Sequence, residues 1–275
     1  RWFATSRLSD FPAERNLVPP YRSLVGCLTA LGKAARLQPP SPFARIFAPV
    51  DKLGTLWEHA IEPQVDPIMS SDVQVMGALK ASLGPDSVHL CIDMQRLFSD
   101  RGPWPAPWMS RVLPTVEKLV ARTPERTVFT RFIPPRRPDD APGMWRAYYT
   151  RWPHVTRDAM DTSLLQLMPQ LERFVPPAHV FDKPVYSGFA TGALHAFLQA
   201  KHVDTLILTG SETDVCVLST ALNAIDLGYR MIIVKDGLCS SSDEVHDASL
   251  RLYEQRYHVQ IELAEAGEVM DAWAL

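Results

Sequence analysis

One cysteine of this chain lies in a local pattern that suits a nucleophile. Residues 206–209 form a short apolar run that predicts a buried strand, and Gly210 with the polar residues after it ends that strand. Cys216 then begins a helical pattern of apolar positions. A thiol in the first turn of a helix lies near unpaired N–H groups, which lower its pKa and favour the thiolate. Cys216 is therefore a candidate nucleophile, although a free cysteine is also a common core residue.

Two more predicted strands place a charged side chain at their carboxyl ends. The apolar run 88–92 is followed by Asp93, and the short run 180–182 is followed by Lys183. Ligands bind at the carboxyl ends of strands in an open parallel sheet, so these side chains can meet there although they are far apart in sequence. A carboxylate can take the proton of a thiol, and an ammonium can hold the pair ionised. Taken singly, Asp93 also fits a strand-end turn and Lys183 a solvated charge.

In this order and spacing, the three segments resemble the isochorismatase-like cysteine hydrolase superfamily, which includes isochorismatases, nicotinamidases and N-carbamoylsarcosine amidases. The matching motifs are Asp93-x-Gln95-x-x-Phe98, Lys183 with Tyr186-Ser187-Gly188-Phe189, and Gly210-x-x-Thr213-Asp214-x-Cys216-Val217 followed by Thr220-Ala221. Asp236 and Ser240-Ser241-Ser242-x-x-x-His246 also fit. The resemblance extends from about Ser87 to the C-terminus.

The resemblance implies a catalytic triad of Asp93, Lys183 and Cys216. Cys216 would attack a carbonyl carbon, Asp93 would transfer the proton, and Lys183 would stabilise the ionised pair. The resemblance also implies a cis peptide bond at Glu212–Thr213 and an oxyanion hole formed by the backbone N–H groups of Glu212 and Cys216. It further implies a homo-oligomer, either a dimer or a tetramer.

The segment 131–153 is the least regular part of this region, with four prolines followed by the aromatic and basic run 145–152. Because it follows a predicted strand, we expect it to lie over the carboxyl-end face of the sheet. Aromatic rings beside arginines suit a planar or carboxylate-bearing substrate. The alternative is a packed lid or a subunit interface that does not touch substrate. The residues predicted to bind substrate are Gln95, Phe98, Arg131, Trp152 and Tyr186.

No metal and no other cofactor are predicted. Nicotinamidases of the superfamily bind a metal through an Asp-x-His pair and a further histidine, but the corresponding segment 131–134 reads Arg-Phe-Ile-Pro. The eight histidines show no H-x-H or H-x₃-H spacing. The glycine-rich motifs of dinucleotide-binding and P-loop proteins do not occur in the sequence either.

Alternating strand and helix patterns predict an α/β fold with three αβα layers and a mostly parallel, six-stranded, Rossmann-like sheet, as in the isochorismatase-like hydrolase fold. The strands are predicted near 87–93, 126–132, 178–183, 204–209, 230–235 and 258–263. The helices are predicted near 107–122, 161–173, 191–202, 215–227, 243–256 and 266–273.

The N-terminal part of the chain has a different composition. Residues 1–68 contain nine of the 24 prolines, and basic residues dominate the first fifty positions. We expect residues 1–75 to form a poorly packed extension and residues 76–275 to form the hydrolase domain. The sequence begins with Arg1, so the extension is also open to interpretation as a non-native upstream segment, with Met69 or Met76 as the functional start.

Composition limits the possible partners and compartments. A hydrophobic content of 46% supports a buried core, and a net charge of −3 does not favour a general surface for nucleic acids or anionic membranes. No apolar stretch approaches the roughly 18 residues that span a bilayer. The four cysteines show no CxxC spacing, which favours a reducing cytoplasm. We therefore expect a cytoplasmic protein that binds a small-molecule substrate, without nucleic-acid or membrane partners.

The leading functional hypothesis is a cysteine-dependent hydrolase that cleaves a C–N bond in a small amide, ureide or carbamoyl compound through a thioester-type acyl-enzyme. One alternative is an isochorismatase-type vinyl-ether hydrolase. The other is a non-catalytic binding protein of the same fold.

Overall fold

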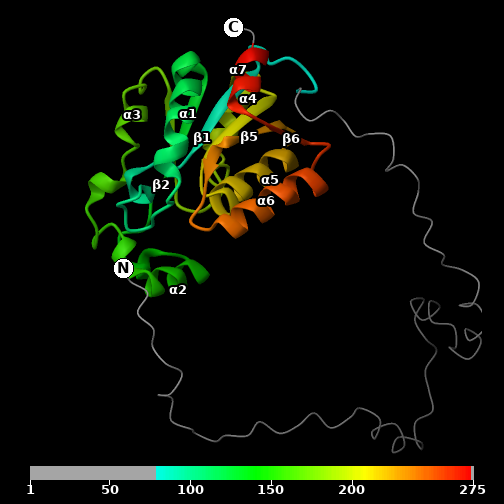
Figure 1. The fold of residues 1–275 in the computed structure, drawn as a ribbon. Coiled ribbons are helices and arrows are strands. Elements are labelled where there is room, and N and C mark those ends of the chain that lie inside the picture. The colour runs from blue at the N-terminus through cyan, green and yellow to red at the C-terminus, as the bar shows by residue number, and fades with distance from the viewer. Residues whose placement is uncertain (1–78, 274–275) are drawn as a thin grey trace, which may run out of the picture. The chain divides into compact units, whose positions relative to one another are not determined.

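The computed structural model describes residues 79–273, and its centre is a six-stranded sheet in which every neighbouring pair is parallel. The strand order is β3-β2-β1-β4-β5-β6 (Figure 1). The strands are β1 (Ser87–Ile92), β2 (Thr127–Phe132), β3 (His179–Lys183), β4 (Thr205–Ser211), β5 (Arg230–Cys239) and β6 (Ile261–Ala264). The predicted α/β fold is confirmed, whereas the predicted extension 1–75 lies outside the described residues.

Helices cover both faces of the sheet, which confirms the three predicted layers (Figure 1). On one face lie α1 (Met109–Arg122), α3 (Pro169–Glu172) and α7 (Ala266–Ala272). On the other face lie α4 (Ala193–Ala200), α5 (Leu218–Asp226) and α6 (Asp243–Arg256). Among the helices of residues 79–273, none has the length and apolar character needed to cross a bilayer.

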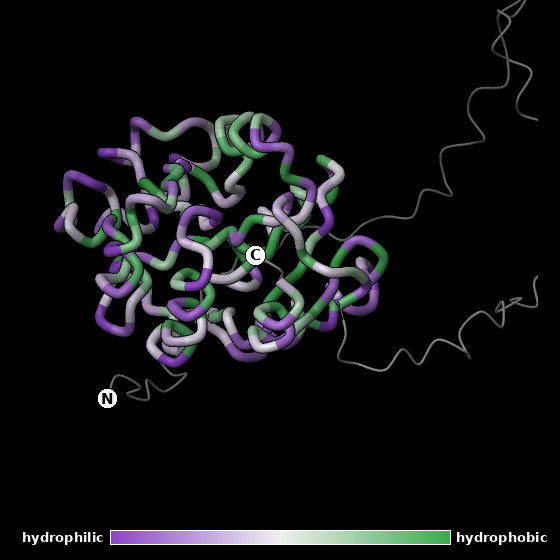
Figure 2. Tube along the Cα trace, turned by 90° about the horizontal axis from the view of Figure 1, so that it is seen from above, coloured by the Kyte–Doolittle hydropathy of each residue, from purple (hydrophilic) through white to green (hydrophobic). Residues whose placement is uncertain are grey.

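Strand side chains alternate between the two layers. In β4, Leu206 and Leu208 pack into the cluster with α4 and α5, while Ile207 packs with α1 and α7 on the opposite face. All three are fully buried. Because successive side chains of a strand point to opposite faces, a strand buried on both sides is apolar at nearly every position. Figure 2 accordingly shows hydrophobic stretches inside the molecule and hydrophilic ones around its periphery.

Two expectations about helices were wrong. The predicted helix 161–173 is broken into a 3₁₀ turn, Thr162–Leu165, and the short α3. Pro169 explains the break, since it lacks an amide hydrogen and keeps the preceding Met168 extended, with ψ at 137°. Conversely, α2 (Met144–Arg151) forms within the segment that we expected to be irregular.

The sheet has its topological switch point between β1 and β4, the place where ligands bind in open α/β sheets. Gly210 in β4 pairs with Ile92 in β1 and has a φ of +117°. A Cβ atom at this glycine would lie 2.0 Å from the Ile92 carbonyl oxygen. Glycine therefore allows β1 and β4 to approach each other closely at this point. Asp93 and Cys216 lie in the segments that directly follow these two strands.

The buried His89 of β1 makes acid stability a testable property of the fold. Its Nε2 lies 2.8 Å from the Thr209 hydroxyl, and complete burial lowers the pKa of His89 from 6.5 to about 3. Between these values the unfolded chain binds a proton that the folded chain does not, so stability falls as the pH drops from 6.5 towards 3. The contribution of His89 amounts to about 2 kcal/mol lost by about pH 5.

We expect His89→Gln to weaken the dependence of the free energy of unfolding on pH in this range, because glutamine does not titrate and keeps a polar group beside Thr209. The measurement is the free energy of unfolding in urea across this pH range, for the wild type and the variant. Parallel profiles for the two proteins would show that His89 is not the titrating group.

Candidate active site

Asp93 is held at the carboxyl end of β1 in an unusual backbone conformation. Its φ is +48°, in the left-handed region where aspartate is one of the more tolerated residues. Its backbone N–H donates to the Thr130 carbonyl and hydroxyl oxygens, both at 3.2 Å, and the Thr130 hydroxyl donates to Asp93 Oδ1 at 2.7 Å. Thr130 lies on β2, the neighbouring strand. These bonds orient the carboxylate so that Oδ2 faces Lys183.

Lys183, the last residue of β3, forms a buried ion pair with Asp93. The Nζ atom lies 2.7 Å from Asp93 Oδ2, and the side chains are 1% and 0% exposed. Nζ also donates to the Val185 carbonyl oxygen at 3.1 Å and lies 5.1 Å from the ring centroid of Phe132. Buried charges are found in proteins when they are paired and hydrogen-bonded, as here.

Cys216 lies in a π-helical turn, Thr213–Val217, between β4 and α5. Thr213 anchors this turn: its hydroxyl donates to the Cys239 carbonyl oxygen at 3.2 Å and lies 2.8 Å from His246 Nδ1. The Tyr253 hydroxyl donates to the Thr213 carbonyl oxygen at 3.1 Å. π-helical turns frequently occur at functional sites, and this one is fixed from β5 and α6.

The structure brings the three predicted triad residues together. Asp93 and Lys183 lie close enough to the Cys216 thiol to shift its pKa by their charges, in opposite directions. Burial lowers the pKa of Lys183, but Asp93 and Cys216 raise it more strongly, so the ammonium remains charged.

Our expectation that the helix start lowers the pKa of Cys216 is wrong for the unliganded protein. Burial raises the pKa of Cys216, the Asp93 carboxylate raises it further, and the Lys183 ammonium only partly opposes this shift. The resting site therefore holds a neutral thiol beside a carboxylate–ammonium pair, and the thiol must lose its proton during attack rather than before it.

Cys216 opens into a cavity of about 270 Å³ with aromatic walls. The lining residues are Phe98, Trp104, Phe132, Tyr148, Trp152, Tyr186, Glu212, Val215 and Cys216. Three of the predicted substrate-binding residues, Phe98, Trp152 and Tyr186, are thus in place beside the thiol. Tyr148 belongs to α2 and Trp152 follows this helix directly, so the segment 131–153 forms part of the cavity wall.

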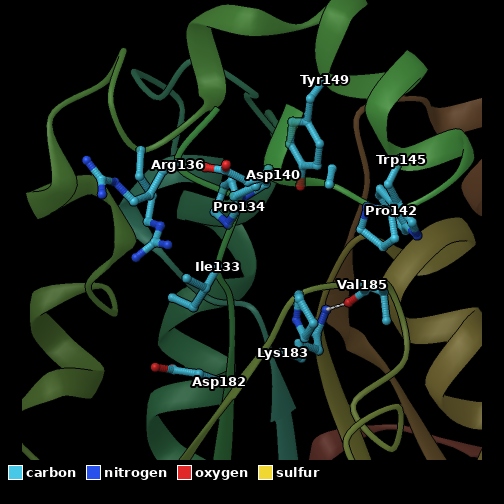
Figure 3. Close-up of a pocket in the computed structure, with 14 residues that line it drawn as sticks. Ile133, Pro134, Arg136, Asp140, Pro142, Trp145, Tyr149, Asp182, Lys183 and Val185 are labelled. Carbon is cyan, nitrogen blue, oxygen red and sulfur yellow. Dashed lines mark hydrogen bonds between the residues drawn. The ribbon is translucent and has the colours of Figure 1, made fainter. Parts of the chain in front are cut away.

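Figure 3 shows a second cavity, of about 430 Å³. It is lined by Trp145 and Tyr149 of α2, by residues 133–136 after β2, and by Lys183 at the end of β3. In Figure 3, Lys183 points towards the Val185 carbonyl group. Cys216 does not line this cavity. Because a nucleophile must reach the carbonyl carbon, we assign the smaller cavity to the reacting group.

Two predicted substrate-binding residues are engaged elsewhere. The Gln95 side chain is fully buried: its amide donates to the Phe132 and Leu165 carbonyl oxygens at 3.1 and 2.8 Å and accepts from the Phe132 N–H at 2.6 Å. Arg131 forms a bidentate pair with Asp182 at 2.7 and 2.9 Å. Neither residue lines the cysteine cavity. Gln95 holds the end of β2 in place, and Arg131 links β2 to β3.

The predicted position of the cis peptide bond is wrong by one residue. The cis bond joins Ser211 and Glu212, not Glu212 and Thr213. Within residues 79–273, no protein group accepts a hydrogen bond from the Glu212 backbone N–H, so this N–H is available for the predicted oxyanion hole. The contribution of Glu212 and Cys216 to such a hole stays a prediction.

The described residues do not fit the metal site of the nicotinamidase branch. Arg131 is paired with Asp182, and the residue two positions after it is Ile133, so the required imidazole is missing from this segment. Residues 79–273 contain no group of three or more His, Cys, Asp or Glu side chains arranged to hold a metal ion.

Sequence reasoning missed several residues of the site. Thr130 escaped because its role depends on β2 lying next to β1, and Trp104 lies in a loop with no motif. The spacing of Trp145, Tyr148 and Tyr149 at i, i+3 and i+4 was a readable helical signal for α2. The Glu212 side chain was overlooked because the resemblance pointed to its backbone alone.

Comparison with known proteins shows the family to which the chain belongs. The family model described as "Isochorismatase domain" matches residues 87–265, and the chain therefore belongs to the isochorismatase family. An uncharacterised isochorismatase family protein of Bacillus subtilis is 37% identical over 84 residues, 28% of this chain and 44% of the relative. Maleamate amidohydrolase of Pseudomonas putida is 29% identical over 129 residues, 46% of this chain and 57% of the relative. The chain thus spans about half the length of these curated relatives.

A solved isochorismatase-like hydrolase from Alkaliphilus metalliredigens superposes with a TM-score of 0.57 and 25% identity, covering 68% of this chain and 99% of that structure.

Proposed function

We propose that this protein is a cysteine-dependent hydrolase that cleaves a C–N bond in a small amide, ureide or carbamoyl compound. The observation that carries the proposal is the meeting of the Cys216 thiol with the buried Asp93–Lys183 pair at an aromatic cavity. The similarity to maleamate amidohydrolase supports amide chemistry over the other reactions of the family.

The geometry suggests a reaction in two steps. As the Cys216 sulfur attacks the substrate carbonyl carbon, its proton passes to Asp93, and the negative charge moves to the carbonyl oxygen. Asp93 then gives the proton to the leaving nitrogen, the C–N bond breaks, and ammonia or an amine leaves a thioester on Cys216. In the second step, water attacks the thioester while Asp93 takes its proton. The acid is released, and the proton returns to the thiol.

The neutral thiol of the resting site fits this scheme. Asp93 is aligned by the Thr130 hydroxyl and paired with Lys183, so its carboxylate is positioned to accept the proton when attack begins. We propose that the backbone N–H groups of Glu212 and Cys216 stabilise the negative oxygen, an effect worth several kcal/mol in related chemistry.

The test is ammonia release from a panel of small amides, ureides and carbamoyl compounds, combined with mass spectrometry of acid-quenched enzyme. For a simple amide we expect ammonia and acid in equal amounts, and for each substrate an acyl or carbamoyl group on the peptide that contains Cys216. Turnover without release of ammonia or an amine would contradict the proposal, as would an acyl group on another residue.

A further inference from the structure

We propose that the Cys216 cavity selects amides whose remaining part is uncharged or cationic, and that Glu212 is the specificity-determining residue. This inference rests on the proposed function and narrows its substrate class. It reverses our expectation of a carboxylate-bearing substrate, which rested on the arginines near the aromatic run.

The walls of the cavity are aromatic rings from four separate parts of the chain. Phe98 and Trp104 stack at 6.3 Å between ring centroids, and Trp104 lies 5.9 Å from Tyr148 and 6.2 Å from Phe132. Tyr186 and Trp152 complete the lining. Aromatic faces carry partial negative charge, so such an enclosure favours apolar and cationic groups and gives a carboxylate no partner.

Glu212 adds the only charged side chain among the residues that line this cavity, and its charge is negative. Ser241 donates its hydroxyl and its backbone N–H to Glu212 Oε2, at 2.7 and 3.4 Å. Within the described part of the chain, Oε1 has no hydrogen-bond donor. The carboxylate also acts by charge on the Tyr148 and Tyr186 hydroxyls, two other lining groups. Oε1 is thus free to accept a hydrogen bond from bound substrate.

Among the described residues, no cationic side chain lines the Cys216 cavity. Lys183 is paired with Asp93. Arg131 of β2 pairs with Asp182, and three arginines of the segment after β2 pair with aspartates, as Arg136–Asp158, Arg137–Asp140 and Arg146–Asp139. Arg157 lines the second cavity but not the Cys216 cavity. Arg151 lies over the Trp152 ring at 5.5 Å but does not line the cavity. A substrate carboxylate would therefore meet Glu212 and aromatic faces without a free cation, which raises the cost of its desolvation.

Three amides of similar size test the charge preference: trimethylammonioacetamide, its neutral isostere tert-butylacetamide, and malonamate. Binding is measured by titration calorimetry on Cys216→Ala, which separates affinity from turnover, and ammonia release is measured on the wild type. Burial raises the pKa of Glu212, so both measurements are made at about pH 8, well above the ordinary range of a carboxyl group. We expect the cationic and neutral amides to bind at least about tenfold more tightly than malonamate.

Glu212→Gln tests the residue itself, because glutamine keeps an oxygen for Ser241 and removes the charge. We expect the preference for the cationic over the neutral amide, measured as the ratio of their dissociation constants, to fall about tenfold. Glu254→Gln, which removes an exposed carboxylate of α6, is the matched control and should leave the preference unchanged.

Tighter binding of malonamate than of the cationic amide would overturn the inference, as would no detectable binding of the cationic amide at millimolar concentration. An unchanged preference in Glu212→Gln would overturn the role of Glu212. If binding follows the expected order but none of the amides releases ammonia, the proposed function fails while the charge preference stands. If ammonia is released but malonamate is preferred, the proposed function stands and the charge preference fails.

Discussion

Cys216→Ala is expected to lower kcat by at least about 10³-fold while leaving the protein folded. The substitution removes the sulfur that forms the thioester, and Cys216 is the only thiol among the residues that line the cavity, which include no serine or threonine. The substitution removes little volume. It also removes a thiol whose ionisation the buried Asp93 carboxylate opposes. The measurements are steady-state ammonia release and thermal unfolding.

Cys216→Ser should fail almost as severely, because a serine hydroxyl is far less acidic than a thiol and Asp93 is a weak base. Cys91→Ala is the matched control, since it deletes a buried thiol of β1 that does not line the cavity. It should lose some stability through the vacated volume but keep kcat. If Cys216→Ala kept substantial turnover of the true substrate, covalent catalysis would be wrong, and vinyl-ether hydrolysis with Asp93 as general acid would become the leading hypothesis.

Lys183→Met is expected to destabilise the protein and to abolish most activity. The ammonium is 1% exposed and lies 2.7 Å from an Asp93 oxygen, so its removal leaves a carboxylate buried without a counter-charge. Breaking a buried pair in this way costs about 3–5 kcal/mol. Activity should fall because Lys183 lowers the pKa of Cys216 and thus favours the ionised sulfur during attack.

A double variant separates these two effects. Asp93→Asn combined with Lys183→Met removes both charges, so we expect the free energy of unfolding in urea to recover a large part of the loss seen in Lys183→Met alone. Turnover should not recover, because the proton acceptor is gone. A Lys183→Met protein as stable as the wild type would show that the ion pair does not have the energetic role that its burial indicates.

Much of the fold was predictable because its elements carry strong local patterns. The central strands β1, β4 and β5 appear as short, mostly apolar runs, and α1, α4, α5, α6 and α7 follow helical spacing with apolar faces. A strand buried on both faces must be apolar at nearly every position, so the pattern follows directly from the layers. The break at Pro169 was also readable from the sequence, since proline prevents a continuous helix there.

The site was predictable only in part. The residue types and the order of Asp93, Lys183 and Cys216 were sufficient to predict that their side chains lie together, because the carboxyl ends of parallel strands meet at one edge of the sheet. The partners of Gln95 and Arg131 were not predictable, because both side chains reach residues up to 70 positions away: Gln95 contacts Leu165, and Arg131 contacts Asp182. Whether such a side chain contacts substrate or holds the scaffold depends on these non-local contacts.

The sequence by itself thus determined the layered α/β architecture and the strands at whose ends Asp93, Lys183 and Cys216, the proposed triad, are placed. Only the tertiary structure decided the protonation and charge of the site. Burial raises the pKa of Cys216 and so favours its neutral thiol. Arginines such as Arg136 pair with aspartates, and Glu212 is the one charged residue among those that line the cavity. Local sequence encodes which groups are present, but desolvation and pairing depend on which distant segments surround them.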